Sequence, residues 1–201
     1  MTGSPGTAFG SEGLAFGVFD HLDRNDLPLR EFYAQRLALA ELYDTAGFHA
    51  YHIAEHHSTP LGLASSPSVF LSALAQRTKR LRFGPLVYTL PLHHPLSLIE
   101  EVCMLDQMSG GRLELGVGKG ISPIETGYFG IDPEQRQKIY FEALEVLLRG
   151  LQGGRLTFEG EYYRYRDVPM ELEPLQKPHP PLWVGVATGD GAAYAGQRGW
   201  N

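Results

Sequence analysis

Three ionisable side chains, Glu55, His56 and His57, follow one another directly after an apolar segment of the sequence. That segment, residues 51–54, has the composition of a buried strand. Ionisable groups at the tip of a buried strand cost free energy, so their presence there needs a reason. Histidine exchanges protons near neutral pH because its unperturbed pKa is about 6.5. The stretch is therefore a candidate acid/base site, and two histidines in a solvated loop are the alternative.

The segment from His52 to His56 also matches H-x-x-E-H, a zinc-ligand pattern of metallopeptidases. Zinc binding by this pattern requires a helix, which places both histidines on one face. On a strand, residues four apart are about 13 Å apart at about 3.3 Å per residue, too far for one ion. Because the segment has strand composition, a zinc metallopeptidase is the less favoured interpretation.

Glycines and basic residues further along the chain indicate an anion site. Gly116, Gly118 and Gly120 have the spacing G-x-G-x-G, which departs from the dinucleotide fingerprint. Glycines at a strand end still let the backbone approach a ligand closely, and Lys119 between them can neutralise an anion. Arg136, in the first turn of the next predicted helix, opposes the helix dipole. That position favours an anionic partner, and a solvated surface position is an equal alternative.

A second strand end offers backbone donors. Ala187, Thr188 and Gly189 lie between a predicted strand and a predicted helix. The N–H groups at a helix N-terminus, with a hydroxyl nearby, can hold a phosphate. Asp190 is the candidate helix cap there, and it would repel a phosphate if it pointed inward. With the two cations above, these groups converge on one phosphate beside the strand ends.

Alternating strand and helix patterns position these groups. Apolar runs predict strands at 14–19, 50–54, 81–90, 113–117 and 182–187, and helical spacing predicts helices at 32–47, 67–78, 95–111, 132–150 and 190–198. A hairpin is predicted over 155–166, a loop over 118–130 and the start of another strand at 199–201. Five strands alternating with helices predict a parallel sheet, either doubly wound or a (β/α) barrel. In both folds the functional loops follow the strands.

The chain ends as a sixth strand begins, whereas an eight-unit barrel takes about 250 residues. The sequence thus resembles the first five units of a longer barrel, with one domain over residues 14–201 that is truncated at its C-terminus. Residues 1–13 are rich in glycine and are predicted to form a flexible arm. The last parallel strand would have an open edge, which further sequence or another chain is expected to cover.

Composition argues against several classes of protein. The formal net charge is −6 and the basic residues are scattered, so nucleic-acid binding is not expected. No stretch approaches the about 18 apolar residues of a membrane span, and no signal peptide is apparent. The single Cys103 is predicted to be a buried structural thiol, which fits a reducing cytoplasm.

Three motifs together resemble the luciferase-like flavin monooxygenases, the bacterial luciferase superfamily. They are Ala54-Glu55-His56-His57, Leu90-Pro91-Leu92-His93-His94-Pro95 and Leu105-Asp106-Gln107-Met108-Ser109-Gly110-Gly111-Arg112. Their order and spacing are more specific than any one of them. The resemblance covers nearly all of residues 14–201 and implies the N-terminal part of a (β/α)8 TIM barrel that binds FMN.

The resemblance also implies residue roles. Glu55 and His56 match the acid and the catalytic histidine near the flavin ring, and Leu86 and Val87 match a pair joined by a non-proline cis peptide beneath that ring. Lys119 and Arg136 match phosphate-binding arginines, and Thr188, between Ala187 and Gly189, matches a phosphate-binding serine. Lysine offers a point charge where the family has a bidentate fork. Gly118 stands where bacterial luciferase has a reactive cysteine, a difference that bears on light emission and not on flavin binding.

These implications predict a monooxygenase that uses reduced FMN and dioxygen to oxidise a small organic substrate. His56 would be the general acid and base, and Glu55 would orient or polarise the site. No nicotinamide site is visible, so a separate flavin reductase is an expected partner, and the resemblance implies a homodimer. The alternatives are a deazaflavin-dependent hydride-transfer enzyme on the same fold and a flavin-binding protein without activity.

Overall fold

The computed structural model of the protein describes residues 14–201, so the predicted arm at 1–13 lies outside the described residues. The strands are β1 (Gly17–Asp20), β2 (Ala50–Ile53), β3 (Arg82–Pro85), β4 (Tyr88–Thr89), β5 (Leu115–Gly118), β6 (Gly154–Glu159), β7 (Arg164–Met170) and β8 (Leu182–Val184). The helices are α1 (Leu29–Ala46), α2 (Pro67–Arg77), α3 (Pro95–Ser109), α4 (Pro123–Tyr128), α5 (Arg136–Gly150) and α6 (Gly189–Gln197), with a 3-10 turn, η1 (Leu90–Leu92).

The barrel strands form two parallel sheets that meet side by side. Their orders are β1-β2-β3 and β4-β5-β8, and Phe83 in β3 pairs with Leu113 just before β5, which joins the two. At the end of the chain, Asn201 donates its N–H to the carbonyl of Leu182 at 2.9 Å and accepts from the N–H of Val184 at 2.8 Å. The last residues therefore pair with β8, which confirms the predicted start of another strand.

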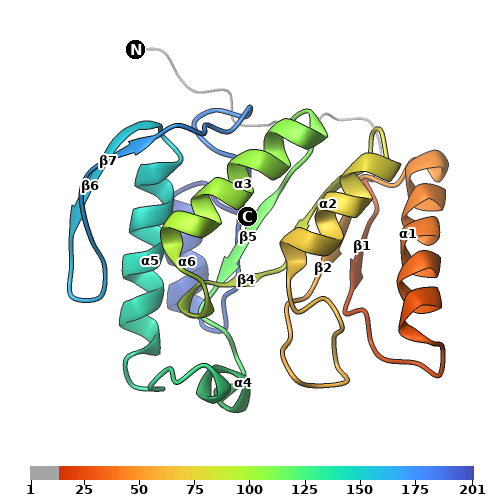
Figure 1. Cartoon of the computed structure of the whole chain (residues 1–201), viewed down its shortest axis with the longest axis horizontal. Coiled ribbons are helices and arrows are strands. Elements are labelled where there is room, and N and C mark those ends of the chain that lie inside the picture. Colours follow the sequence, from red (N-terminus) through yellow and green to blue (C-terminus); the bar gives the residue numbers. More distant parts are fainter. Residues whose placement is uncertain (1–13) are drawn as a thin grey trace.

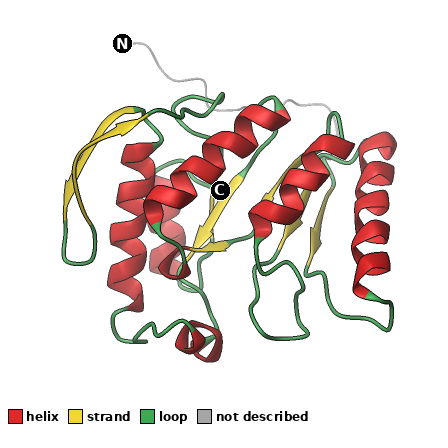
Figure 2. Ribbon diagram, in the orientation of Figure 1, coloured by secondary structure: helices red, strands yellow, loops and turns green. Residues whose placement is uncertain are grey.

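Helices cover one face of these strands. Figure 1 shows α1, α2, α3 and α5 in a row along the sheet, with α4 apart from this row at the carboxyl ends of the strands. The antiparallel hairpin β6-β7, predicted from the sequence, lies beyond α5, and the strands run behind the helices in Figure 2. Strand residues such as Tyr51, Phe83 and Leu115 are fully buried in the core between the layers. The fold is α/β and of the TIM-barrel type, and it is a partial barrel.

Three predicted elements differ from the structure. The apolar run 81–90 is two strands, because β3 pairs with β2 whereas β4 pairs with β5. The predicted loop 118–130 contains α4. The helix expected from Asp132 begins at Arg136, since the N–H groups of Gln135 and Arg136 both bond the Asp132 carbonyl in a turn, each at 3.0 Å.

Cys103 is a free thiol buried in α3, as predicted. Burial, assisted by the nearby Asp106 carboxylate, raises its pKa to about 11, which argues against a nucleophilic role. Among the described helices, none has both the length and the apolar composition that crossing a bilayer requires.

Candidate active site

A cavity of about 470 Å³ opens at the carboxyl ends of the parallel strands. This volume lies within the range of about 300–1,000 Å³ that is typical of small-molecule sites. Among the residues that line it are most of those predicted from the sequence: Glu55, His56, Leu86, Val87, Gly118, Lys119, Arg136 and Ala187. The lining also includes residues that the sequence did not single out: Phe19, His21, Ile121, Ser122, Glu125, Thr126 and Val186.

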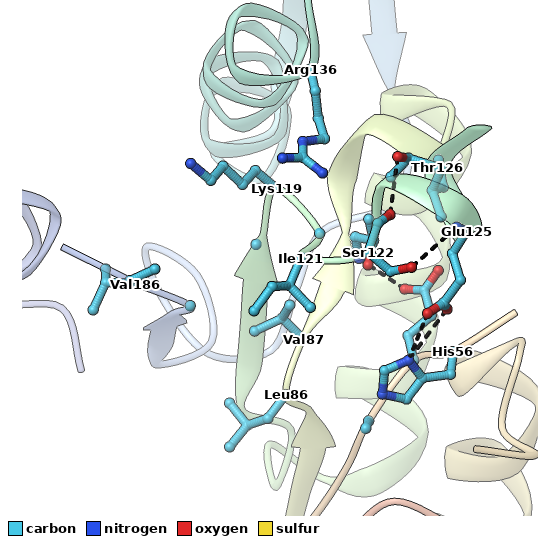
Figure 3. A pocket seen from close by; sticks show the side chains of 18 of the residues that line it. His56, Leu86, Val87, Lys119, Ile121, Ser122, Glu125, Thr126, Arg136 and Val186 are labelled. Atoms are coloured by element: carbon cyan, nitrogen blue, oxygen red, sulfur yellow. Dashed lines mark hydrogen bonds and ion pairs between the residues drawn. The ribbon is translucent and has the colours of Figure 1, made fainter. Parts of the chain in front are cut away.

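The carboxylate beside His56 is that of Glu125 in α4. Nδ1 of His56 lies 3.2 Å from one carboxylate oxygen of Glu125 and 3.3 Å from the other. Figure 3 shows this pair, with the second ring nitrogen directed away from Glu125. His56 therefore pairs with Glu125 and not with Glu55, although both Glu55 and His56 line the cavity.

Glu55, also in the lining of the cavity, joins its own loop to the segment from Thr89 to His93. Its side chain is fully buried, and its oxygens lie 2.7 Å from Nε2 of His57 and 3.0 Å from Nε2 of His93. The backbone N–H of Thr89 donates to the same carboxylate at 2.8 Å. Burial acts to raise the pKa of Glu55, but hydrogen bonds from the two imidazoles and the amide outweigh it and leave that pKa below its usual value.

The peptide bond between Leu86 and Val87 is cis, which confirms the expectation from the resemblance. Both side chains line the cavity floor beside β5. A Cβ at Gly116 would lie 2.0 Å from the carbonyl oxygen of Pro85, and one at Gly118 would lie 2.5 Å from Cγ2 of Val87. Only glycine therefore lets β5 pass this close to the cis segment.

Lys119 and Arg136 provide positive charge at the cavity. Figure 3 shows the two side chains together above the end of β5, apart from His56. Nη1 of Arg136 is buried and has no hydrogen-bond partner within the part of the chain that the structure describes. Because a buried polar group without a partner is unfavourable, especially a charged one, this nitrogen fits an anionic ligand atom in the cavity.

The predicted phosphate loop after β8 reaches the cavity only in part. Ala187 lines the cavity, whereas Thr188 and Gly189 are exposed and are absent from its described lining. The Thr188 hydroxyl accepts from the N–H of Gly191 at 3.2 Å and so caps α6, the role that the sequence gave to Asp190.

Glu125 was not predicted as a site residue, because the helix that carries it, α4, was not predicted. A signal for it exists: Ser122-Pro123-Ile124-Glu125 has a cap residue, proline in the first turn and glutamate three positions later. The Ser122 hydroxyl accepts from the N–H of Glu125 at 3.2 Å, which is the expected cap.

His52 has a different role from His56. It lies in β2, where its Nε2 is 2.9 Å from Glu114 and Arg82 contacts the second oxygen of the same carboxylate at 2.6 Å. The strand prediction for this segment is confirmed, and the two histidines of the H-x-x-E-H pattern face different carboxylates.

Comparison with known proteins identifies the family. Residues 14–200 match the family model described as luciferase-like monooxygenase. The chain belongs to the luciferase-like monooxygenase family. The resemblance found in the sequence is thereby confirmed.

Curated members of this family are similar over most of the chain. The uncharacterised protein y4wF of Sinorhizobium fredii is 52% identical over 94% of this chain and 55% of its own length. The 4-hydroxyprotoasukamycin monooxygenase of Streptomyces nodosus subsp. asukaensis is 37% identical over 81% and 44%. The oxygenase component of flavin-dependent trigonelline monooxygenase from Acinetobacter baylyi is 28% identical over 94% and 53%. The chain thus spans about half the length of these relatives.

Several solved structures share the fold. Monooxygenase RslO1 from Streptomyces bottropensis has a TM-score of 0.89 at 30% identity, over 94% of this chain and 58% of that one. The oxygenating constituent of 3,6-diketocamphane monooxygenase from Pseudomonas putida, solved with FMN, has a TM-score of 0.80 at 22% identity over 94% and 56%. A coenzyme F420 dependent tetrahydromethanopterin reductase from Methanopyrus kandleri has a TM-score of 0.73 at 21% identity over 92% and 54%. At these last two identities the likeness concerns the fold alone.

Proposed function

We propose that the protein acts as a monooxygenase, using reduced FMN and dioxygen to oxidise a small organic substrate. One observation carries the proposal: a single cavity combines the His56 imidazole with the cations of Lys119 and Arg136. Nη1 of Arg136 is buried there and has no hydrogen-bond partner among the described residues. An acid/base group and an anion site in one pocket match a phosphorylated cofactor whose reactive ring needs proton transfer.

The cavity residues fit FMN in charge and shape. Lys119 and Arg136 would hold the phosphate, with the backbone at Ala187 beside it. Leu86 and Val87 offer an apolar floor for the flavin ring, and Val186 adds a second apolar wall. When bound, FMN supplies the chemistry of oxygen activation. The relative named as a flavin-dependent oxygenase component and the fold neighbour solved with FMN support this choice.

The protein's own part is to bind, orient and move protons. The two cations neutralise the phosphate and fix the cofactor, while the apolar side chains exclude water from the reacting ring. His56 takes up or delivers a proton at the ring nitrogen directed away from Glu125. Glu55, whose side chain is buried at the cavity wall, keeps the segments that carry His57 and His93 in place.

A deazaflavin is the alternative cofactor, because an F420 dependent reductase has the same fold. The reaction would then be a hydride transfer without dioxygen. Oxygen consumption during turnover separates the two proposals. Flavin binding with no turnover in the presence of reductant would favour the third possibility, a binding protein without activity.

The proposal includes a flavin reductase as partner, since a relative is named as the oxygenase component of its enzyme. We also propose that residues 14–201 form one barrel domain, that the protein is a homodimer and that it is located in the cytoplasm. A lone cysteine that is buried and free suits a reducing compartment.

Titration with FMN tests the cofactor site. We expect Arg136→Gln to weaken FMN binding at least about tenfold, since a hydrogen bond to a charged group contributes about 1.5–3 kcal/mol. Lys119→Ala should also weaken FMN binding. Fewer directional hydrogen bonds are lost in this variant, because the lysine ammonium acts as a point charge. The dissociation constant is measured by the change in flavin absorbance.

Arg149→Gln is the matched control, because Arg149 is an exposed arginine of the same helix that pairs with Glu145. It should leave the dissociation constant unchanged. Equal affinity in the parent and Arg136→Gln would contradict the assignment of the phosphate site, and a parent that binds neither FMN nor F420 would overturn the proposed function.

A further inference from the structure

We propose that Glu125 is the positioning residue of His56: its carboxylate selects the ring tautomer that leaves a free nitrogen in the cavity. This inference rests on the proposed function for its catalytic meaning. The arrangement itself is a property of the chain and is testable without cofactor. It involves a residue that lies 69 positions from His56 in the sequence.

The Glu125 carboxylate is held between two consecutive residues of the loop after β2. Its Oε2 accepts from the backbone N–H of His57 at 2.8 Å and lies 3.2 Å from Nδ1 of His56. The side chains of His56 and Glu125 are only 16% and 13% exposed. Hydrogen bonds shielded from water to this degree are stronger than exposed ones and fix geometry.

An ionised carboxylate only accepts hydrogen bonds, so Nδ1 of His56 must carry a hydrogen to bond it. In the neutral ring the second nitrogen, Nε2, then has a free lone pair. Figure 3 shows that nitrogen directed away from Glu125, and His56 lines the cavity. After Nε2 takes up a proton, the same carboxylate stabilises the charged imidazolium. Glu125 thereby prepares His56 both to accept a proton and to return it.

The rest of the ring's surroundings restrict its rotation without choosing a tautomer. The ring of His21 stacks on His56 with centroids 5.6 Å apart and planes at 15°. A Cβ at Gly62 would lie 3.1 Å from both Cβ and Cδ2 of His56, so the glycine lets the loop close against the ring. The carboxylate is therefore the contact that sets the proton position.

The backbone of α4 presents Glu125 in a fixed position. Ser122 caps its N–H, and the Thr126 hydroxyl donates to the Ser122 carbonyl at 3.1 Å. Thr126 is 1% exposed, which anchors the helix against the barrel. In a capping box the glutamate reaches back to the cap residue. Here the Glu125 side chain reaches His56 and His57 instead, which assigns it a role at the site.

The first test reads the tautomer in protein free of cofactor, by nitrogen-15 NMR of the histidine rings with His56→Gln to assign the signal. We expect the parent to hold the proton on Nδ1 and Glu125→Gln to shift His56 toward the other tautomer or a mixture. Glu125→Asp keeps a carboxylate and should recover the parent tautomer in part. A parent ring protonated on Nε2 alone, or a Glu125→Gln spectrum identical to the parent, would overturn the inference.

The second test separates positioning from binding. Glu125→Gln should bind FMN within about twofold of the parent but slow the reoxidation of bound reduced FMN by dioxygen by about tenfold or more, in line with the contribution of general acid/base groups. In a His56→Ala background, Glu125→Gln should cause no further change, because the two residues act as a unit. Additive losses would contradict the proposal.

Glu134→Gln, an exposed glutamate before α5, is the control for charge loss and should leave both readouts unchanged. Failure of the parent to bind FMN would remove the proposed function and leave the NMR test of Glu125 intact. If Glu125→Gln does not fold, the His56 tautomer in the parent and in Glu125→Asp still tests the inference.

Discussion

Among the described glycines, two in the sheet interior are the least able to accept a side chain. A Cβ at Gly84 would lie 1.9 Å from the carbonyl oxygen of Glu114, and at Gly116 the corresponding distance to the Pro85 oxygen is 2.0 Å. Both neighbours are backbone oxygens, so an added Cβ could be accommodated only if the adjacent strands moved apart. We expect Gly84→Ala and Gly116→Ala each to lower the free energy of unfolding by at least about 1–3 kcal/mol, measured by urea denaturation.

Gly196→Ala provides the contrast. Gly196 lies inside α6, and a Cβ there would meet nothing within 4 Å. Alanine should stabilise the helix by about 0.5–1 kcal/mol relative to glycine. A Gly116→Ala protein as stable as Gly196→Ala would show that β5 does not pass the cis segment as closely as described.

At the scale of residues, the position of His56 could be predicted from the sequence but its hydrogen-bond partner could not. Its position at a strand tip follows from the apolar run before it, and so does its place in the cavity. Its partner does not, because Glu125 comes from a segment 69 residues away. Arg136 was predicted as an anion-binding residue from its unfavourable position at a helix start, and its Nη1 is buried without a hydrogen-bond partner among the described residues.

At the scale of elements, one glutamate of α5 secures the β6-β7 hairpin. The carboxylate of Glu142 accepts from the N–H groups of Glu161, Tyr162 and Tyr163, at 3.0, 2.9 and 2.6 Å. An alanine at 142 would leave these three donors at the hairpin turn without that acceptor. We expect Glu142→Ala to cost about 1–3 kcal/mol and to raise amide hydrogen exchange mainly between β6 and β7.

Glu145→Ala, one turn further along α5, is the matched control, because that glutamate only makes an exposed pair with Arg149. Exposed pairs contribute about 0–1 kcal/mol, so its exchange pattern should remain that of the parent. Uniform exchange changes in Glu142→Ala, spread over the whole barrel, would argue against a local role.

Elements were predictable where their ends carry strong signals. Helix α3 begins at Pro95 and ends before Gly110, whose φ of 69° is the left-handed conformation that glycine adopts readily. Helix α4 has only 6 residues, too few for an apolar period to register. The run 81–90 was predicted as one strand although Gly84 and Pro85 interrupt its apolar pattern, and these residues lie just before the break between β3 and β4.

At the scale of the molecule, the order of strands and helices predicted a parallel sheet, either doubly wound or a barrel, and the family resemblance implied the barrel. The rule that sites follow parallel strands predicted where the cavity lies. Which side chains meet there depends on loop paths that local patterns do not encode. Thr188 is an example. It was predicted to bind phosphate because it is a hydroxyl residue at a strand end, but it caps α6 and is not among the described residues that line the cavity.

Buried carboxylates tie the barrel together and make its stability depend on pH. Glu114 bonds His52 and Arg82 between β2, β3 and β5, and Glu55 bonds His57 and His93. Burial opposes ionisation of both glutamates, but these hydrogen bonds and the neighbouring cations outweigh it and lower both pKa values below the usual 4.5. In the unfolded chain the same groups bind protons at higher pH than in the folded protein.

The stabilisation by these glutamates is therefore complete above about pH 4.5 and is lost as the pH falls through the lower folded-state pKa values. We expect the urea midpoint to fall below that pH. Glu114→Gln should be less stable than the parent at pH 7 by about 1–3 kcal/mol, because Arg82 and His52 lose a charged acceptor. It should also lose less stability on acidification, since one of the titrating groups is gone. Glu134→Gln should follow the parent at every pH, whereas an acid dependence of Glu114→Gln as steep as that of the parent would show that Glu114 does not hold the strands together through its charge.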